Sequence, residues 1–320
     1  MTLTISLTKT QFVFKYAFTK IIIKKMFKKL MLKMPTNILH LRSYSSDTVI
    51  IEKIGYITTI GINRPEKRNC VDSNTAKILE NAISEFEKDN TSLAAVLYGT
   101  GGNFCAGHDL QEIVDLQHNK SNWELSMLPS RKYVSKPMVA ALNGFTVGGG
   151  FELALLCDLR VMEETAVMGF YGRRFGIPLT DGATVRLPAM IGLSRALDLI
   201  LTGRTLTAKE AFDWGLANKL VACGTSLGQA IQLATCLIKF PQDSLKIDRT
   251  STYNASFNQV YDELLKYEKD NSKKVKLSDL VEGAKKFLSG IGKHGKTYNI
   301  TEKESLEWEN EFTNTAKSKL

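Results

Sequence analysis

Two glycine-rich turns constrain the fold of this 320-residue chain more than any other feature. The first turn is GGNFCAGHDL, residues 101–110, and the second is NGFTVGGGFEL, residues 143–153. Each turn follows a short apolar strand pattern and leads into a predicted helix, so backbone N–H groups there are free to point at a ligand. Two such turns converging from separate strands can place two donors on one oxygen, which is the geometry of an oxyanion hole. The pattern therefore favours chemistry at an acyl carbonyl group.

Strand and helix patterns alternate around these turns, with short connections. Alternating apolar residues predict a hairpin over residues 49–63, and short apolar runs predict strands at 93–98, 138–142 and 159–162. Helical spacing, with Ser73 or Asn74 as the first N-cap, predicts helices over 73–89, 109–117, 149–156, 194–201, 207–214, 226–239, 254–269 and 277–288. This order predicts an α/β fold of stacked ββα units, with a core over 47–240 and a C-terminal helical region over 241–320.

The net charge of +9 comes from the first 46 residues. Nine of the 42 basic residues lie there without any acidic residue, and the remainder carries 33 basic and 33 acidic residues. A neutral body argues against a nucleic-acid partner. A basic, acid-free stretch with hydroxyl residues is typical of a mitochondrial transit peptide and predicts a location in the matrix, the alternative being a basic arm without a targeting role. Lysines interrupt every apolar run of this segment, so no transmembrane segment is expected.

Five cysteines lie at positions 70, 105, 157, 223 and 236, without any C-x-x-C pair. An odd number without such pairs does not indicate a disulfide framework. Cys105 lies inside the first turn, where a small packing residue is the simpler interpretation.

Four motifs carry a resemblance to a known family. They are NRPEKRN (63–69), GGNFCAGHDL (101–110), KPMVAALNGFTVGGGFELALLCDLRV (136–161) and LTGRTLTAKEAFDWGLANKLV (201–221). In this order and spacing the chain resembles the enoyl-CoA hydratase/isomerase, or crotonase, superfamily from about residue 49 to residue 239. The resemblance implies a crotonase-like spiral of ββα units, an acyl-CoA substrate, no metal, no cofactor apart from the coenzyme A of the substrate, and a homotrimer or dimer of trimers.

The resemblance also assigns site residues. The two oxyanion donors fall on the backbone N–H groups of His108 and Gly149, whatever the His108 ring does; that ring is either a base or a pocket-lining side chain. The further substrate-binding positions implied are Arg68, Ala106, His108, Asp109, Leu110, Gly148, Gly149 and Gly172. The glycines of the second turn permit a close approach of the thioester, and the helix that begins there directs its positive end at the oxyanion.

Glu152 is the predicted catalytic carboxylate, because a glutamate at this position helps to hold or activate water in related hydratases. A second glutamate of those hydratases corresponds to Gly172 here, which removes one member of the acid–base pair. Asp181 is the nearest replacement and the second predicted catalytic residue; otherwise it makes an Asx turn before Gly182. Arg173 and Arg174 either pair with these carboxylates, contact a charged acyl group, or lie on the surface.

Three groups of functions remain open at this point, the second of which holds the isomerase, decarboxylase and hydrolase. An enoyl-CoA hydratase with a non-standard acid–base set is the first. An enoyl-CoA isomerase tolerates the loss of one glutamate better, and the two arginines leave room for an acyl-CoA decarboxylase or hydrolase. A non-catalytic homologue that binds CoA esters or RNA is the third.

Overall fold

A computed structural model gives the fold, and it describes residues 44–46, 48–115, 129–131, 133–257, 260–273 and 276–291. Residues 1–43 of the predicted targeting segment and the connection over 116–128 lie outside the described residues. The strands are β1 (Tyr44–Ser46), β2 (Val49–Ile54), β3 (Ile57–Ile62), β4 (Ala94–Gly99), β5 (Met138–Leu142), β6 (Phe145–Val147), β7 (Leu159–Glu163), β8 (Val167–Gly169), β9 (Leu206–Thr207) and β10 (Lys219–Val221).

The α-helices are α2 (Ser73–Lys88), α3 (Leu110–Asp115), α4 (Gly149–Leu156), α5 (Ala183–Ile191), α6 (Leu193–Thr202), α7 (Ala208–Asp213), α8 (Ser226–Leu237), α9 (Gln242–Phe257), α10 (Tyr261–Ser272) and α11 (Leu277–Leu288). Three short 3-10 helices are η1 (Pro65–Lys67), η2 (Pro129–Arg131) and η3 (Tyr171–Phe175). This mixture confirms the predicted α/β fold with helices at the C-terminal end of the described chain. None of these helices combines the length and the apolarity that crossing a membrane needs.

The larger sheet has the strand order β1-β2-β3-β4-β5-β7-β10, and β6, β8 and β9 form a second, small sheet. The predicted hairpin is present as the antiparallel pair β2 and β3. From β3 onward the pairs β3–β4, β4–β5, β5–β7 and β7–β10 are parallel. The sheet also includes β1, so pairing begins at Tyr44, inside the segment assigned to targeting.

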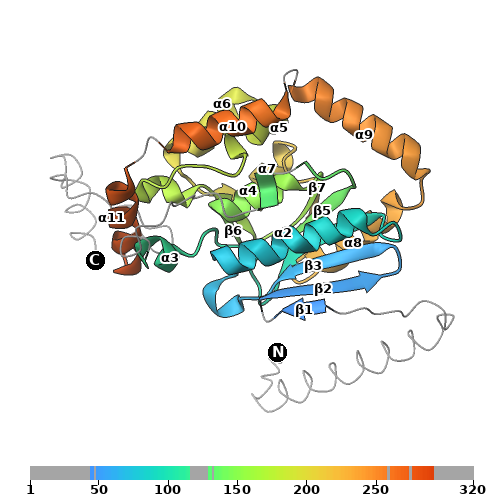
Figure 1. Cartoon of the computed structure of the whole chain (residues 1–320), viewed down its shortest axis with the longest axis horizontal. Helices are drawn as coiled ribbons and strands as arrows, with labels where there is room; N and C mark the ends of the chain where they lie inside the picture. The colour runs from blue at the N-terminus through green and yellow to red at the C-terminus, as the bar shows by residue number, and fades with distance from the viewer. Residues whose placement is uncertain are drawn as a thin grey trace, which may run out of the picture. The chain divides into compact units, whose positions relative to one another are not determined.

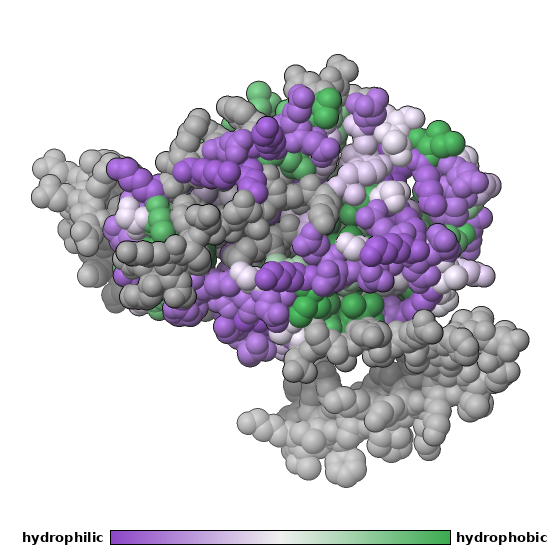
Figure 2. Space-filling model, in the orientation of Figure 1, coloured by the Kyte–Doolittle hydropathy of each residue, from purple (hydrophilic) through white to green (hydrophobic). Residues whose placement is uncertain are grey.

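Both faces of the central strands are buried, which explains their uninterrupted apolar sequences. Successive residues alternate between two cores: Ala95 and Leu97 of β4 belong to the core that includes Leu79 and Phe86 of α2, whereas Ala94 and Val96 pack with Ala230 and Ala234 of α8. In Figure 1, α2 crosses the sheet in front of β3. Hydrophilic residues cover the outer side of α2 in Figure 2, as expected for an amphipathic helix with one buried face.

The N-cap of α2 differs from the prediction. Asp72, and not Ser73 or Asn74, holds the cap position, because its side chain accepts a hydrogen bond from the backbone N–H of Thr75. An aspartate that bonds the third N–H of a helix satisfies one of the donors that lack a helical partner. All five cysteines are free, as expected for a chain without a disulfide framework.

The sequence patterns missed α5 and α9 and misplaced the helix that precedes α11, whereas α11 has the predicted bounds. Pro188 lies inside α5, and an internal proline argues against a helix unless tertiary packing stabilises it. The helix predicted over 254–269 is wrong, since α9 ends at Phe257 and α10 begins at Tyr261. The polar sequence of α9 has no clear apolar face that would predict a packed helix. The helix is held in place by polar contacts instead, since Arg249 and Tyr253 both donate to the Asp158 carboxylate.

Parallel pairing places the carboxyl ends of β3, β4 and β5 at one edge of the sheet. The motifs NRPEKRN, GGNFCAGHDL and NGFTVGGG follow these three strands, so they meet at that edge. The first and second turns also join directly through a bridge between Cys105 and Thr146. Ligands of open parallel sheets bind at this edge, which identifies the place to examine for a site.

Candidate active site

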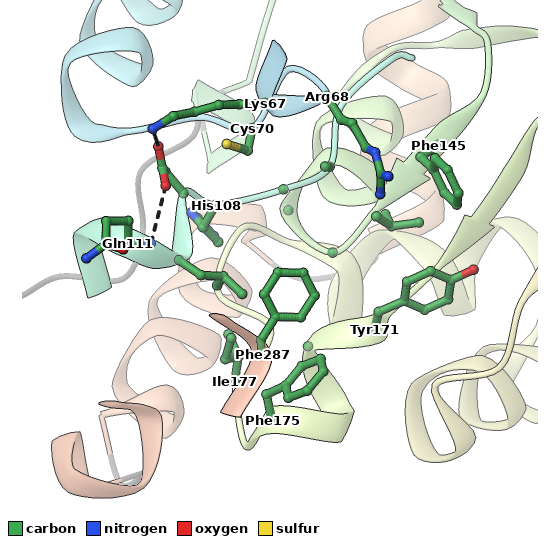
Figure 3. A pocket seen from close by; sticks show the side chains of 18 of the residues that line it. Lys67, Arg68, Cys70, His108, Gln111, Phe145, Tyr171, Phe175, Ile177 and Phe287 are labelled. Atoms are coloured by element: carbon green, nitrogen blue, oxygen red, sulfur yellow. Dashed lines mark hydrogen bonds and ion pairs between the residues drawn. The ribbon is translucent and has the colours of Figure 1, made fainter. Parts of the chain in front are cut away.

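A cavity of about 660 Å³ lies where the two glycine turns meet. In Figure 3, Lys67 and Arg68 lie on one side of it, Phe175, Ile177 and Phe287 lie on the opposite side, and His108 lies between. Of the predicted site residues, those that line the cavity are Arg68, Ala106, His108, Asp109, Leu110, Gly148, Gly149, Glu152 and Gly172. Asp181 is the one predicted site residue that does not line it.

The two turns approach closely because glycines occupy their contact points. A Cβ atom on Gly150 would lie 2.2 Å from the carbonyl oxygen of Cys105, and one on Gly107 would lie 3.1 Å from the backbone nitrogen of Gly149. Gly107 also has a φ of +91°, which side chains disfavour. Glycine is therefore required on both sides of this junction.

The backbone amides of His108 and Gly149 are available for a ligand. The neighbouring amides are used, since Asp109 donates to Val71, Gly148 donates to Gly169 and Gly107 donates to the Cys105 sulfur. Within the described part of the chain, neither His108 nor Gly149 donates a backbone hydrogen bond. Gly149 is also the first residue of α4, so the positive end of this helix points toward the cavity.

The basic side of the cavity is organised by Asp109. Its carboxylate accepts hydrogen bonds from Arg64 at 3.0 Å and Lys67 at 2.8 Å. Burial alone would raise the pKa of Asp109, but these two cations outweigh it and lower the pKa. Arg68 is exposed, has a φ of +52° and stacks over the Phe145 ring at 5.3 Å, which leaves its guanidinium open to solvent and suited to an anion.

Glu152 lies at the start of α4 and is only 1% exposed. Its Oε1 atom accepts the backbone N–H groups of Asp181 at 2.9 Å and Ala183 at 3.2 Å. Glu152 therefore lines the cavity, and its carboxylate fixes the entry into α5.

Asp181 is fully buried and lies behind His108 as seen from the cavity lining. One carboxylate oxygen of Asp181 lies 3.3 Å from Nε2 of His108 and accepts a hydrogen bond from the Thr180 hydroxyl group. The His108 contact is close enough for an ionic interaction, but the ring N–H is not aligned for a hydrogen bond, so both ring nitrogens lack a hydrogen-bond partner among the described residues.

His108, Glu152 and Asp181 thus form one buried group, although 29 residues separate the two carboxylates in the sequence. Each offers one nitrogen or oxygen atom within 4.8 Å of the others, and it is the one such group of three among the residues that the structure describes. An imidazole between two carboxylates can move protons and can also coordinate a divalent cation. The expectation that the protein holds no metal and no cofactor stays a prediction.

Gly172 lies in η3 and lines the cavity, so no side chain projects from this position. A Cβ atom here would lie 3.2 Å from the Cβ atom of Ile177, which leaves little room without a shift of that side chain. Position 172 therefore contributes no carboxylate to the cavity.

Arg173 and Arg174 do not line the cavity. Arg173 is exposed and donates to the carbonyl oxygen of Ile200, while Arg174 stacks on Tyr171 at 4.4 Å and donates to the carbonyl oxygen of Gly203. The suggestion that they contact a charged acyl group at this cavity is wrong, because η3 turns both side chains toward α6 and the residues that follow it.

The apolar side of the cavity was missed by sequence reasoning. Phe287 of α11 contacts Phe175 of η3, with ring centroids 5.2 Å apart, and both line the cavity with Ile177 and Leu179. Gly283 permits this contact, since a Cβ atom there would overlap the Phe175 carbonyl group. No local signal relates residues more than 100 positions apart, although the amphipathic spacing of α11 predicted that one face is buried.

Comparison with known proteins agrees with this geometry. The sequence profile described as enoyl-CoA hydratase/isomerase matches residues 52–292. The chain is 34% identical over 197 residues to mevalonyl-coenzyme A hydratase of Aspergillus fumigatus, which covers 60% of this chain and 73% of that protein. It is 32% identical over 228 residues to a probable enoyl-CoA hydratase of Rhizobium meliloti, covering 70% and 88%.

Solved structures give the same result. The crystal structure of carnitinyl-CoA hydratase from Mycobacterium avium matches with a TM-score of 0.70 and 28% identity, covering 77% of this chain and 97% of that one. The fold, the two-turn cavity and the match over residues 52–292 agree. This chain therefore belongs to the enoyl-CoA hydratase/isomerase family and is a hydratase-like enzyme of acyl-CoA thioesters.

Proposed function

We propose that the protein adds water across the double bond of a 2-enoyl-CoA thioester, with the thioester oxygen held by the amides of His108 and Gly149. The observation that carries this proposal is the pair of available amides from two separate turns, on two residues that line one cavity. Hydrogen-bond donors that are already in place stabilise the enolate oxygen more than the ground-state carbonyl group. Removing one donor of this kind raises a barrier by about 2.7–4 kcal/mol.

Glu152 acts as the base that takes a proton from water. Glu152 lines the cavity beside Gly149, and its Oε1 atom accepts two backbone N–H groups that hold the carboxylate in place. Water oxygen then adds to the β-carbon, and the electrons of the double bond move to the thioester oxygen. The α-carbon still needs a proton, and Gly172 provides none.

The acyl group is apolar in this proposal. Its binding surface is formed by Leu110, Phe175, Ile177, Leu179 and Phe287, and neither Arg173 nor Arg174 reaches it. A carboxylated acyl group would lose its hydration there without gaining a cation, which favours hydration over decarboxylation. Isomerisation remains the second candidate, because Glu152 alone can carry one proton between two carbons.

The proposal is tested by mixing the full-length protein with a short trans-2-enoyl-CoA and following the ultraviolet absorbance of the conjugated thioester. We expect the absorbance to fall with wild-type protein and to stay constant with Glu152→Gln. Glu164→Gln changes an exposed carboxylate on another loop and is the control that keeps wild-type activity. Binding of CoA esters without any absorbance change would favour a different reaction or a binding role.

We also propose that residues 1–46 direct the protein to the mitochondrial matrix, from their excess of basic residues and lack of acidic ones. Fused to a fluorescent protein, this segment is expected to be imported into mitochondria in a manner that requires membrane potential. A fusion that stays in the cytosol would contradict the proposal.

A homotrimer or dimer of trimers is the proposed assembly. Leu193, Leu197 and Leu201 recur every four residues along α6, and they are 65%, 40% and 67% exposed. Such a stripe on one side of a helix is typical of a surface that another subunit covers. Sedimentation is expected to give the trimer mass or twice that, and a monomer at micromolar concentration would refute it.

A further inference from the structure

The cavity lacks an obvious donor for the α-carbon. Hydration needs one group that accepts a proton from water and another that protonates carbon. Glu152 fills the first role in the proposed function, but Gly172 has no side chain and Asp181 does not line the cavity. The donor must then be a titratable side chain at the cavity wall that lies close to Glu152.

The His108 imidazole meets these conditions. The side chain lines the cavity and is 6% exposed, and both ring nitrogens lack a hydrogen-bond partner among the described residues. Its backbone is fixed, because Val71 donates to Gly107 and Asp109 donates to Val71 on either side of it. Because the backbone is held in place, only side-chain torsions can bring the ring nitrogens toward a substrate.

Asp181 is placed to orient this ring. Its carboxylate oxygen lies 3.3 Å from Nε2, and Asp181 itself does not line the cavity. A small rotation of the ring aligns the N–H with this oxygen, and contacts of catalytic groups often tighten only when substrate is bound. A carboxylate behind an imidazole fixes the tautomer and stabilises the charged ring, as in other histidine-dependent enzymes.

We infer that His108 and Asp181 together replace the second glutamate of related hydratases, with the His108 imidazolium as the proton donor to the α-carbon and Asp181 as its positioning residue. This inference rests on the proposed hydration. It gives His108 two separate roles, since its backbone amide binds the thioester oxygen while its ring transfers a proton.

The proton balance closes without another reactant. Water gives its hydroxide to the β-carbon and its proton to Glu152, and the double-bond electrons form the enolate. The enolate electrons then take a proton from the His108 imidazolium to form the C–H bond, leaving a neutral ring. The proton on Glu152 then passes to that ring through one bridging water molecule, since an atom of each group lies within 4.8 Å of the other, and both groups return to their starting states.

Several titratable and charged groups surround the ring and enter any pH profile. Glu152 comes from α4 and Asp181 precedes α5, while Arg186 of α5 donates to the carbonyl oxygen of Asp181. Asp109 follows His108 directly and is paired with Arg64 and Lys67. Cys70 lines the same cavity, and burial raises the pKa of its thiol to about 12, so it stays neutral over the range of the assay.

The first test compares hydration by full-length wild-type protein, His108→Gln, Asp181→Asn and the double variant, with metal-free buffer as a further control. Substitution at position 108 leaves the backbone amide in place, so the inference predicts that kcat falls by about 10²-fold or more, within the usual range for an acid–base group, while KM changes little. The double variant should be no slower than His108→Gln, because Asp181 acts through the ring. The dependence of kcat/KM on pH should differ between wild-type protein and His108→Gln, because the variant lacks one acid–base group.

The second test does not depend on hydration. A saturated acyl-CoA in deuterated water should exchange its α-hydrogen on wild-type protein and on Glu152→Gln, but not on His108→Gln, as measured by mass spectrometry. If the α-hydrogen exchanges only when His108 is present, but no hydration is seen, the proposed function is refuted and the role of the His108 ring is not. Exchange that is lost equally in both variants, a wild-type pH profile in His108→Gln, additive losses in the double variant, or activity that disappears with metal removal would overturn the inference. Retained binding of the same acyl-CoA shows that each variant is folded.

Discussion

Replacing Gly107 with alanine is the sharpest perturbation of the proposed oxyanion hole. The new Cβ atom would lie 3.1 Å from the Gly149 nitrogen and 3.0 Å from the Val147 carbonyl oxygen. Both distances are shorter than ordinary van der Waals contact, and both contacts are to backbone, so the second turn must move away. Gly102 provides a matched control in the same loop, since its φ of +90° equals that of Gly107 within one degree, yet its Cβ atom would meet nothing within 4 Å.

The expected magnitudes differ between stability and activity. Each alanine must adopt a positive φ, which costs about 1–2 kcal/mol of folding free energy. Only Gly107→Ala also displaces the Gly149 amide, and the loss of one donor corresponds to about a 10²–10³-fold fall in kcat. We therefore expect Gly102→Ala to lose stability but keep its turnover within a few-fold, and Gly107→Ala to lose both.

The assay pairs enoyl-CoA hydration with urea unfolding of the two variants. Hydration is measured at a temperature where both variants are folded. The difference in activity then reflects the geometry of the oxyanion hole and not a difference in the fraction of folded protein. Equal kcat values for Gly102→Ala and Gly107→Ala would show that the junction of the two turns does not hold the thioester oxygen.

Three other changes have defined outcomes. Gly172→Glu in the His108→Gln background should recover about 10-fold in hydration, less than the roughly 10²–10⁴-fold of a well-placed acid–base group, because Ile177 must shift to make room; no recovery would show that position 172 cannot take part in proton transfer. Asp158→Asn weakens the anchor of α9 and should lower the unfolding free energy by about 1–3 kcal/mol with unchanged kcat, as measured by urea unfolding and hydration. Burial raises the pKa of the Cys105 and Cys157 thiols from 9.0 to about 12, so the stabilisation from keeping them neutral is present below pH 9 and is lost as the pH rises toward 12. At pH 8 a thiol reagent should therefore modify only exposed thiols quickly, namely Cys223 and Cys236, and rapid labelling of all five would contradict the burial.

Much of the backbone could be predicted because its signals are local. The hairpin, α4, β5 and α11 lie where the apolar spacing placed them, since burial of one or both faces requires that spacing. The two glycine turns were also recognisable, because backbone torsions with positive φ and close approach both require glycine. Errors occurred where long-range packing overrides local preference, as in the proline-containing α5 and the polar α9.

The sequence by itself determined the chemistry that the cavity offers through its backbone, namely two amides next to Glu152, because turn and helix geometry follow from nearby residues. Only the tertiary structure decided which side chains face the cavity. Asp181 contacts the His108 ring without lining the cavity, and Arg174 stacks on Tyr171. Phe287, from the C-terminal helix α11, packs on Phe175 and completes the apolar side of the cavity. The physical reason is that a side chain's direction depends on the elements packed against it, and residues far apart in the sequence supply those elements.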